Sequence, residues 1–422
     1  MFLQRIVRRS SRSRLLIYIA IVGVLIFCSS LNKPSSPPIT QIDDIPEPIH
    51  DDNDDRYEST LDTVALPWYT HPHPALPVSN NFSTGHLSLD QWQALWEHSV
   101  ERAQQVAELV LGPIQGIPGS VHRTYEAADR VRAQIDCWTS QGQWKQQDGY
   151  HLAKHFQDPL YGKCKRQHDP YVWSTPTTTC HLDDTVDPVT WCSLLDGRNM
   201  LIVGDLVQYQ LHEVLLDAMR DGPTVCFGEL NCKDHTLCQQ PEARMRYIRN
   251  DILSPVSRIN RAKGHPSVDT IEWPFITSPM MRAYSVLILN RAPVVEDDET
   301  FIQQLVETMR VIRSRAPDTL ILYRSTSIGH PFCNDAQAPL ESHLKDEELR
   351  HLPYGWSELK RRNAMARKIV EAAGGVFVDL AALTDLRPDG HMGGQDCLRY
   401  CIPGPLDAWV QVLYHVFLSL AQ

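Results

Sequence analysis

The residues of this sequence that are best placed for chemistry stand directly after a short apolar segment, residues 200–203. Gly204, Asp205 and Leu206 follow this segment, and a helical pattern begins there. A nucleophile at such a sharp turn from strand to helix would lie at the amino terminus of the helix, which stabilises developing negative charge. The turn is therefore the first candidate for a reactive site.

Other polar side chains follow two further apolar segments, 285–289 and 319–323, or lie in a loop near the carboxyl terminus. They are Asn290, Ser325, Ser327, His330, His391, Asp396 and Arg399. In an open parallel sheet, ligands bind beside the carboxyl ends of the strands. We therefore expect reactive residues at that edge of a sheet.

Alternating strand and helix patterns must hold these residues in place. Short apolar runs predict strands, and amphipathic patterns predict helices. The predicted strands are 200–203, 285–289, 319–323 and 376–379, and the predicted helices run from the turn to about residue 219 and over 301–312, 358–373 and 406–420. This alternation implies an α/β fold, a three-layer sandwich with a mostly parallel sheet and helices on both faces.

Cysteine usage indicates an oxidising compartment. One of the eleven cysteines, Cys28, lies in an apolar run near the amino terminus. The others suggest up to five disulfides, and four of them fall in the irregular stretch 137–198, which we expect to be stapled by disulfides. A zinc site is the weaker alternative, because no paired Cys-x-x-Cys ligands occur. We predict neither a metal site nor a cofactor.

The amino terminus predicts a membrane anchor. Five arginines precede an uncharged apolar run over residues 15–31, and no acidic residue occurs before Asp43. Residues 1–14 are therefore expected in the cytoplasm, residues 15–31 in the membrane and the rest in the lumen. A cleaved signal peptide is the alternative, with Cys28, Ser29 and Ser30 as its cleavage region. A short span favours the endoplasmic reticulum or the Golgi.

The chain after the anchor divides by composition. Residues 32–85 are rich in proline and acidic residues and read as a stalk, which carries the glycosylation sequon at Asn81. Residues 86–136 read as a helical stem, with helical spacing from Trp92 to Val110 and an end near Gly112. Residues 137–422 read as the lumenal domain.

Composition narrows the possible functions. Hydrophobic residues make up 42% of the chain and charged residues 22%, which excludes a wholly disordered chain and a polytopic membrane protein. The net charge of −11 argues against nucleic acid as a partner, because a phosphate backbone demands clustered lysine and arginine.

Four blocks of the sequence resemble a known family. They are 203–211, similar to a Gly-Asp-Ser block; 287–291, which includes Asn290; 323–332, similar to an Arg-Thr-x-Ser-Pro-x-His block; and 386–391 with 396–404, similar to a closing Asp-Cys-x-His-Trp-Cys-x-Pro-Gly block. In this order they resemble the PC-esterase, or trichome-birefringence-like, family of the SGNH hydrolase superfamily, which includes Golgi polysaccharide O-acetyltransferases. The closing block is the specific one. The order of the blocks, with the turn at Gly204, predicts that Leu206 and Asp396 lie close together at the carboxyl edge of the sheet.

The resemblance implies roles for these positions. Gly204, Asn290 and His330 would serve the oxyanion hole or bind substrate, and Asp396 would be the retained carboxylate of a Ser-Asp-His triad. The nucleophilic serine is replaced by Leu206, which cannot form an acyl ester.

The residue at the position of the general base also differs from the family's histidine. Arg399 stands there, and an arginine cannot accept a proton because its pKa is above about 12. The nearby His391 is a possible substitute base, although a structural hydrogen bond is the preferred interpretation. An ion pair between Arg399 and Asp396 would keep the old site ordered, and Arg399 could also hold an anionic sugar carboxylate.

Three functions are consistent with the sequence. The first is acyl transfer or ester hydrolysis on glycans, which the resemblance implies. The second is an inactive relative that binds glycans or scaffolds a partner, which the two substituted positions favour. The third is a glycosyltransferase, which fits the membrane topology but lacks an Asp-x-Asp metal motif at a strand end.

The topology is directly testable. We expect residues 34–422 to be protected from protease in sealed microsomes, because the arginine-rich flank should stay in the cytoplasm. Immunoblotting of the carboxyl-terminal domain before and after protease treatment measures this, with detergent-opened microsomes as the control. Digestion of that domain in intact microsomes would contradict the predicted orientation.

Overall fold

The computed structural model describes most of the chain beyond the predicted stalk. The described residues are 85–147, 152, 164, 169–176, 180–220, 233–263, 269–394 and 396–422. The expected cytoplasmic tail, the membrane segment 15–31 and Asn81 lie outside them. None of the helices that are described has both the length and the hydrophobicity that a membrane span requires.

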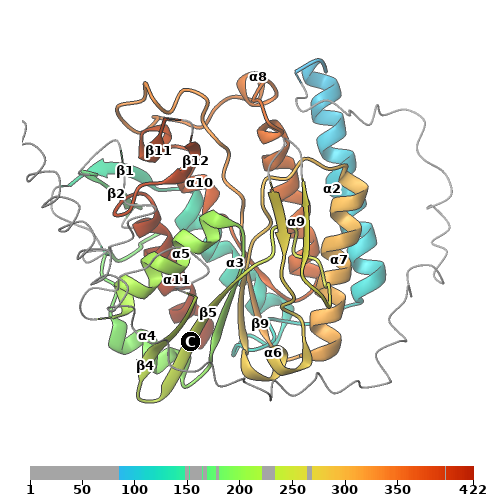
Figure 1. Cartoon of the computed structure of the whole chain (residues 1–422), viewed down its shortest axis with the longest axis vertical. Coiled ribbons are helices and arrows are strands. Elements are labelled where there is room, and N and C mark those ends of the chain that lie inside the picture. Colours follow the sequence, from blue (N-terminus) through green and yellow to red (C-terminus); the bar gives the residue numbers. More distant parts are fainter. Residues whose placement is uncertain are drawn as a thin grey trace, which may run out of the picture. The chain divides into compact units, whose positions relative to one another are not determined.

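A mixed, mostly parallel sheet forms the centre of the domain (Figure 1). The strand order is β10-β9-β8-β3-β5-β4, and all neighbouring pairs are parallel except β4 with β5. The strands are β3 (Met200–Gly204), β4 (Asp234–Gln239), β5 (Glu242–Arg249), β8 (Val286–Leu289), β9 (Leu320–Arg324) and β10 (Val376–Val378). The prediction of an α/β fold with a mostly parallel sheet is confirmed.

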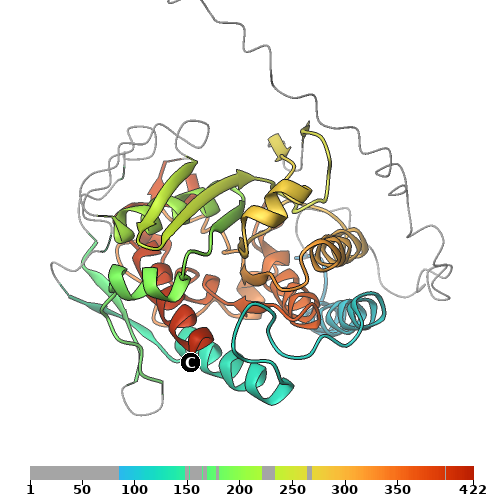
Figure 2. The same cartoon turned by 90° about the horizontal axis from the view of Figure 1, so that it is seen from below.

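Helices cover both faces of this sheet (Figures 1 and 2). One face carries α3 (Tyr125–Ser140), α4 (Pro188–Leu195), α5 (Leu206–Met219) and α11 (Leu406–Ala421). The other carries α2 (Leu89–Leu111), α6 (Ser278–Ala283), α7 (Asp298–Arg315) and α9 (Leu359–Ala372). The predicted stem 86–136 therefore supplies α2 and α3, and each of them buries apolar residues in one of the two cores.

The alternation of side chains along each strand divides the interior into these two cores. Met200 and Ile202 of β3 point into the core with α5 and α11, whereas Leu201 and Val203 point into the core with α7 and α9. Because both faces are covered, the parallel strands read as unbroken apolar runs. This is why the sequence predicts β3, β8, β9 and β10 within one or two residues.

The strands β5 and β4, which end the strand order, were not predicted from the sequence. In β5 the inward residues Ala243, Met245 and Tyr247 alternate with outward Glu242 and charged neighbours, so the segment does not read as an apolar run. The strand is nevertheless as buried on its inner face as its neighbours. The period of two was the available signal.

Smaller elements complete the described part of the chain. They are β1 (Gln143–Gln146) with β2 (Tyr171–Ser174), β6 (Asn260–Lys263) with β7 (Asp269–Glu272), β11 (His391–Gly393) with β12 (Asp396–Tyr400), the helices α8 (Asp346–Leu349) and α10 (Ala381–Thr384), and the 3-10 turns Trp356–Glu358 and Pro388–Gly390. The β11–β12 hairpin carries the closing block of the sequence.

Four disulfides lie within the described residues. They join Cys137 to Cys180, Cys164 to Cys401, Cys192 to Cys238 and Cys333 to Cys397. Three of them start in the stretch 137–198, so the predicted stapling of this irregular segment is confirmed. Cys226 and Cys232 lie outside the described residues.

Candidate functional site

The turn between β3 and α5 is held by a capping carboxylate. The Asp205 Oδ1 atom accepts a hydrogen bond of 2.8 Å from the backbone N–H of Gln208, so Asp205 is the N-cap of α5. Leu206 is the first residue of the helix and is partly buried. A Cβ atom added to Gly204 would lie 3.0 Å from the backbone oxygen of Asn290, so glycine lets β3 approach the end of β8.

A buried guanidinium joins this turn to the end of β9. Arg324 donates from Nε to Gln208 Oε1 at 2.7 Å and lies 3.3 Å from Asp205 Oδ1. The face of the Trp409 ring covers the guanidinium at 4.7 Å. Arg324 is only 1% exposed, so these contacts replace the water that the charge would otherwise require. Asp205 is therefore committed to a helix cap and an ion pair.

The amide of Asn290 is committed to the loop after β9. Its Nδ2 donates to the backbone oxygen of Arg324 at 3.2 Å and to Thr326 Oγ1 at 3.0 Å. The Thr326 hydroxyl in turn donates to the backbone oxygen of Arg291, which leaves its oxygen as an acceptor. Two acceptors therefore face the nitrogen and assign the orientation of the amide. Both amide protons are used, and an oxyanion donor requires a free one.

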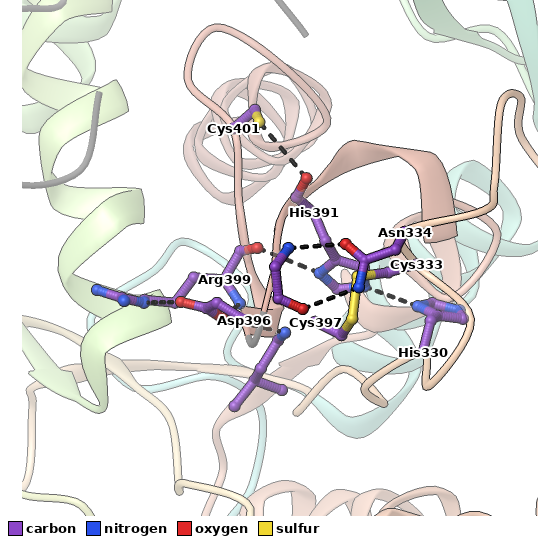
Figure 3. The surroundings of a disulfide bond; sticks show 10 residues. His330, Cys333, Asn334, His391, Asp396, Cys397, Arg399 and Cys401 are labelled. Atoms are coloured by element: carbon purple, nitrogen blue, oxygen red, sulfur yellow. Dashed lines mark hydrogen bonds and ion pairs between the residues drawn. A yellow bond between two sulfur atoms is a disulfide. The ribbon is translucent and has the colours of Figure 1, made fainter. Parts of the chain in front are cut away.

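His391 and His330 form a buried imidazole pair (Figure 3). The His391 Nε2 and His330 Nδ1 atoms are 2.7 Å apart. The outer nitrogens face backbone carbonyls, with His330 Nε2 at 3.0 Å from Asp385 O and His391 Nδ1 at 3.2 Å from Arg399 O. The Tyr400 ring stacks on His391 with centroids 4.5 Å apart. His391 is thus positioned by a structural hydrogen-bond network.

The protonation of this pair follows from its surroundings. Burial lowers the pKa of His330 to about 4 and lowers the pKa of His391 well below its ordinary value. Both rings are therefore neutral and carry one proton each. The two protons are shared among three contacts, one between the rings and one from each ring to a backbone carbonyl. One proton therefore makes the hydrogen bond between the rings, and the other makes a hydrogen bond to one of the two carbonyls. No nitrogen of the pair is left to face a substrate.

Asp396 is held by Arg399, the residue at the position of the family's base. Arg399 Nε donates to Asp396 Oδ2 at 2.5 Å, and Asp396 Oδ1 accepts from the backbone N–H of Arg399 and of Leu398. The side chains are 24% and 28% exposed, so the pair lies at the surface of the β11–β12 hairpin. The carboxylate that would orient a catalytic histidine is instead part of an ion pair with its own hairpin.

Gln210 links this hairpin to α5. Its Nε2 donates to the backbone oxygen of Tyr400 at 2.7 Å, and its Oε1 accepts from the backbone N–H of Tyr400 at 3.0 Å. Gln210 lies one turn after Leu206, and Tyr400 ends the strand that begins at Asp396. The structure thus joins the elements that carry Leu206 and Asp396. Sequence reasoning missed Gln210, although a glutamine among the apolar positions of a buried helix was a signal.

The loop after β9 is stapled to the same hairpin (Figure 3). The Cys333–Cys397 disulfide joins the loop to the hairpin, and the backbone N–H of His330 donates to the backbone oxygen of Cys397 at 3.1 Å. The Asn334 side chain exchanges two hydrogen bonds with the backbone of Gly394, at 2.8 and 2.7 Å. The blocks that contain His330 and Asp396 therefore form one rigid unit.

The two serines near the site have other partners. Ser325 Oγ accepts from the backbone N–H of Ala381 at 2.7 Å, and Ser327 Oγ lies 2.8 Å from Thr384 Oγ1. Both serines are buried, with exposed fractions of 0% and 3%. Neither hydroxyl contacts a histidine ring. Among the described residues, no group of three or more His, Cys, Asp or Glu side chains is arranged to hold a metal ion.

The Gln210 contact allows a direct test of how the site is held together. We expect Gln210→Ala to lower the free energy of unfolding by about 2 to 3 kcal/mol, because it leaves the buried N–H and C=O of Tyr400 without partners. Urea denaturation measures this change. Gln105→Ala on the exposed face of α2 is the matched control and should cost far less. Equal effects of the two substitutions would contradict the proposed linkage.

Asp385 predicts a pH dependence of stability. Its Oδ1 accepts from the backbone N–H of Ile328 at 3.0 Å, and burial raises the pKa of Asp385 to about 7. In the unfolded chain the Asp385 carboxyl ionises near pH 4, whereas in the folded protein it stays protonated to about pH 7. Asp385 therefore removes stability progressively as the pH rises through this window.

Asp385→Asn keeps the acceptor for Ile328 but cannot ionise. Relative to wild type, we expect this variant to gain up to a few kcal/mol of stability between pH 4 and pH 7. Urea denaturation across this range measures the gain, and the exposed Asp318→Asn should show none. Parallel stability curves for wild type and Asp385→Asn would show that the carboxyl is not held protonated.

Comparisons with known proteins agree with the sequence and the geometry. Residues 292–416 match the model of the family described as PC-Esterase, a GDSL/SGNH-like acyl-esterase family found in Pmr5 and Cas1p. This segment contains His330, Asp396 and Arg399, and it begins after the β3–α5 turn. The fold is accordingly of the SGNH-like α/β type.

Two individual proteins are also similar. Protein trichome birefringence-like 42 of Arabidopsis thaliana is 43% identical over 51 residues, which cover 10% of this chain and 14% of that protein. A solved structure, the periplasmic domain of a lipopolysaccharide acetyltransferase of Salmonella ser. Paratyphi A, is similar with a TM-score of 0.33 and 13% sequence identity. The match covers 55% of this chain and 90% of that one. Over residues 292–416, the resemblance of this chain to the PC-esterase family is confirmed.

Proposed function

We propose that this chain is a glycan-binding protein with a PC-esterase-like domain that does not perform serine-type acyl transfer. The observation that carries the proposal is the ion pair of Asp396 with Arg399, together with an isobutyl side chain at position 206. The family's chemistry needs a hydroxyl and a proton acceptor at these two positions. The geometry around both is ordered, which suits recognition of a ligand without its conversion.

The ion pair supports this proposal because both carboxylate oxygens of Asp396 already accept hydrogen bonds from its own hairpin. A triad carboxylate acts by orienting a histidine and stabilising its charged form. Here both oxygens of Asp396 already accept hydrogen bonds from the hairpin, and the guanidinium of Arg399 cannot accept a proton. Removal of even one triad member eliminates most of the nucleophilic rate.

The neighbouring groups do not replace the missing ones. His391 is buried against His330 and Tyr400, and the hydroxyls of Ser325 and Ser327 are bonded within the loop after β9. A hydroxyl that attacks an ester must lie within hydrogen-bond distance of its base. None of the three side chains is part of such a pair, and this supports a binding role.

The wider setting of the proposal comes from the amino terminus and the family. We place the chain in the membrane of the Golgi or the endoplasmic reticulum as a single-pass type II protein, anchored by residues 15–31. Its partner there would be a glycan or an acylated glycan, as expected for a domain similar to acyl-esterases. Acyl transfer or ester hydrolysis on glycans is the alternative.

An esterase assay separates the two functions. We expect the purified chain to show no turnover of p-nitrophenyl acetate above the buffer rate and no labelling by a serine-directed fluorophosphonate, because the described residues near the site include no hydroxyl paired with a base. Leu206→Ser alone should stay silent, since its proton has no acceptor. Leu206→Ser with Arg399→His would restore the family's side chains beside Asp396, and we expect measurable hydrolysis.

The controls identify the source of any activity. The triple variant that adds Asp396→Asn to the double substitution should lose the regained hydrolysis, because the new histidine would lack its orienting carboxylate. A wild-type chain that forms a covalent adduct at Ser325 or Ser327 would overturn the proposal. Mass spectrometry of the labelled peptide would locate that adduct.

A further inference from the structure

Two exposed aromatic side chains belong to the segment between β9 and α9. Among the residues that the structure describes, three large aromatic side chains are more than a third exposed, and they are Tyr125 at 45%, Phe332 at 38% and Tyr354 at 53%. Phe332 and Tyr354 both belong to this loop, which leaves the carboxyl edge of the central sheet. Exposed aromatic rings are costly in water and often mark a binding surface.

Phe332 is fixed beside the ion pair of the former active site. Its neighbour Cys333 is bonded to Cys397, which follows Asp396 directly. The Phe332 ring packs edge-on against the His330 ring, with centroids 5.6 Å apart. Because His330 is itself bonded to the β11–β12 hairpin, the ring of Phe332 is attached to a rigid base.

Tyr354 is held in an unfavourable backbone conformation. Its φ angle is +60°, a region that side chains other than glycine rarely adopt. Trp356, two residues further along the chain, stabilises this turn. Its backbone N–H donates to the backbone oxygen of Pro353 at 3.0 Å, and its ring packs against the Tyr354 ring with centroids 5.1 Å apart. Backbone strain at an exposed residue costs stability and concentrates at ligand sites.

Trp356 connects the two aromatic positions. Its indole ring lies against the loop at Gly329, where an added Cβ atom would be 2.4 Å from the ring. Gly329 precedes His330, and the His330 ring contacts Phe332. A continuous set of contacts therefore runs from Tyr354 through Trp356 and the loop to Phe332.

We propose that Phe332 and Tyr354 form a stacking platform for neutral pyranose rings of a glycan, an inference that rests on the proposed glycan-binding function. A pyranose ring has an apolar face of C–H groups that packs on an aromatic ring, while its hydroxyls stay in water. A pre-organised platform loses little entropy on binding, which explains the rigid staple and the strained turn. The Asp396–Arg399 pair beside it is already neutralised, so the surface favours an uncharged sugar.

A protein partner fits these observations less well. A specific protein interface buries about 800 Å² on each side and has an extended apolar centre. Here two rings stand out from a polar loop, and both are partly covered by the residues that fix them. Separate, rigid aromatic faces suit individual sugar units along a chain.

Calorimetry with defined oligosaccharides tests the platform. The full chain is purified in a detergent without a sugar headgroup, and cellohexaose and mannohexaose serve as neutral probes and hexagalacturonic acid as the charged one. We expect Tyr354→Gly and Phe332→Ala each to weaken binding of the neutral probes by about tenfold or more. Tyr125→Ala removes an aromatic ring of similar exposure on α3 and should leave the affinity unchanged.

The choice of glycine at position 354 protects the test against misfolding. Glycine adopts a φ of +60° without strain, so the thermal unfolding midpoint should not fall although the ring is lost. Tyr354→Phe, which keeps the ring, should bind like wild type. A folded Tyr354→Gly variant with wild-type affinity for the neutral probes would overturn the platform.

The outcomes also separate this inference from the proposed function. If hexagalacturonic acid alone binds, and Tyr354→Gly does not alter its affinity, the protein binds glycans but not through the platform. If none of the three probes binds the wild-type chain, both the platform and the proposed function fail.

Discussion

A positive charge buried at the carboxyl edge of the central sheet determines how the surrounding segments are placed. The guanidinium of Arg324 bonds to Gln208 and Asp205 at the start of α5, and Trp409 of α11 covers it. An unpaired buried charge costs several kcal/mol, so the three elements must stay together. This requirement places the end of β9 beside the β3–α5 turn. The loop that follows β9 is then directed toward the β11–β12 hairpin.

Several polar groups of the site that this arrangement creates bond within the protein. Asp205 bonds to Arg324 and to its own helix, the Asn290 amide to the loop after β9, and His391 to His330. In a working hydrolase such groups are left partly free for the transition state. Each bond formed within the protein stabilises the ground state and removes one donor or acceptor from reaction. The bonds within the protein therefore order the edge of the sheet.

The sequence predicts those parts of the structure that depend on neighbouring residues. The strands at 200–203 and 319–323 follow from apolar runs, and the ion pair of Asp396 with Arg399 joins residues that are only three positions apart. The contact between His330 and His391 joins residues 61 positions apart and depends on the register of the β11–β12 hairpin. Distant contacts of this kind have no local pattern.

Gln210 illustrates the same limit. Its helix is predictable, but its partner is the backbone of Tyr400, which is 190 positions away along the chain. Backbone groups carry no sequence signal, because every residue except proline offers the same donor and acceptor. A buried glutamine indicates that a partner exists, and the fold decides which one.

The frame beneath the site does not depend on the two substituted positions. Arg387 of the closing block pairs with Asp169 and Asp389, and its guanidinium lies over the Trp144 ring at 4.4 Å. Neither this cluster nor the Cys333–Cys397 disulfide contains Leu206 or Arg399. Contacts that do not share partners contribute to stability nearly independently. The frame can therefore keep its geometry whichever side chains stand at positions 206 and 399, and the surface beside these positions stays ordered.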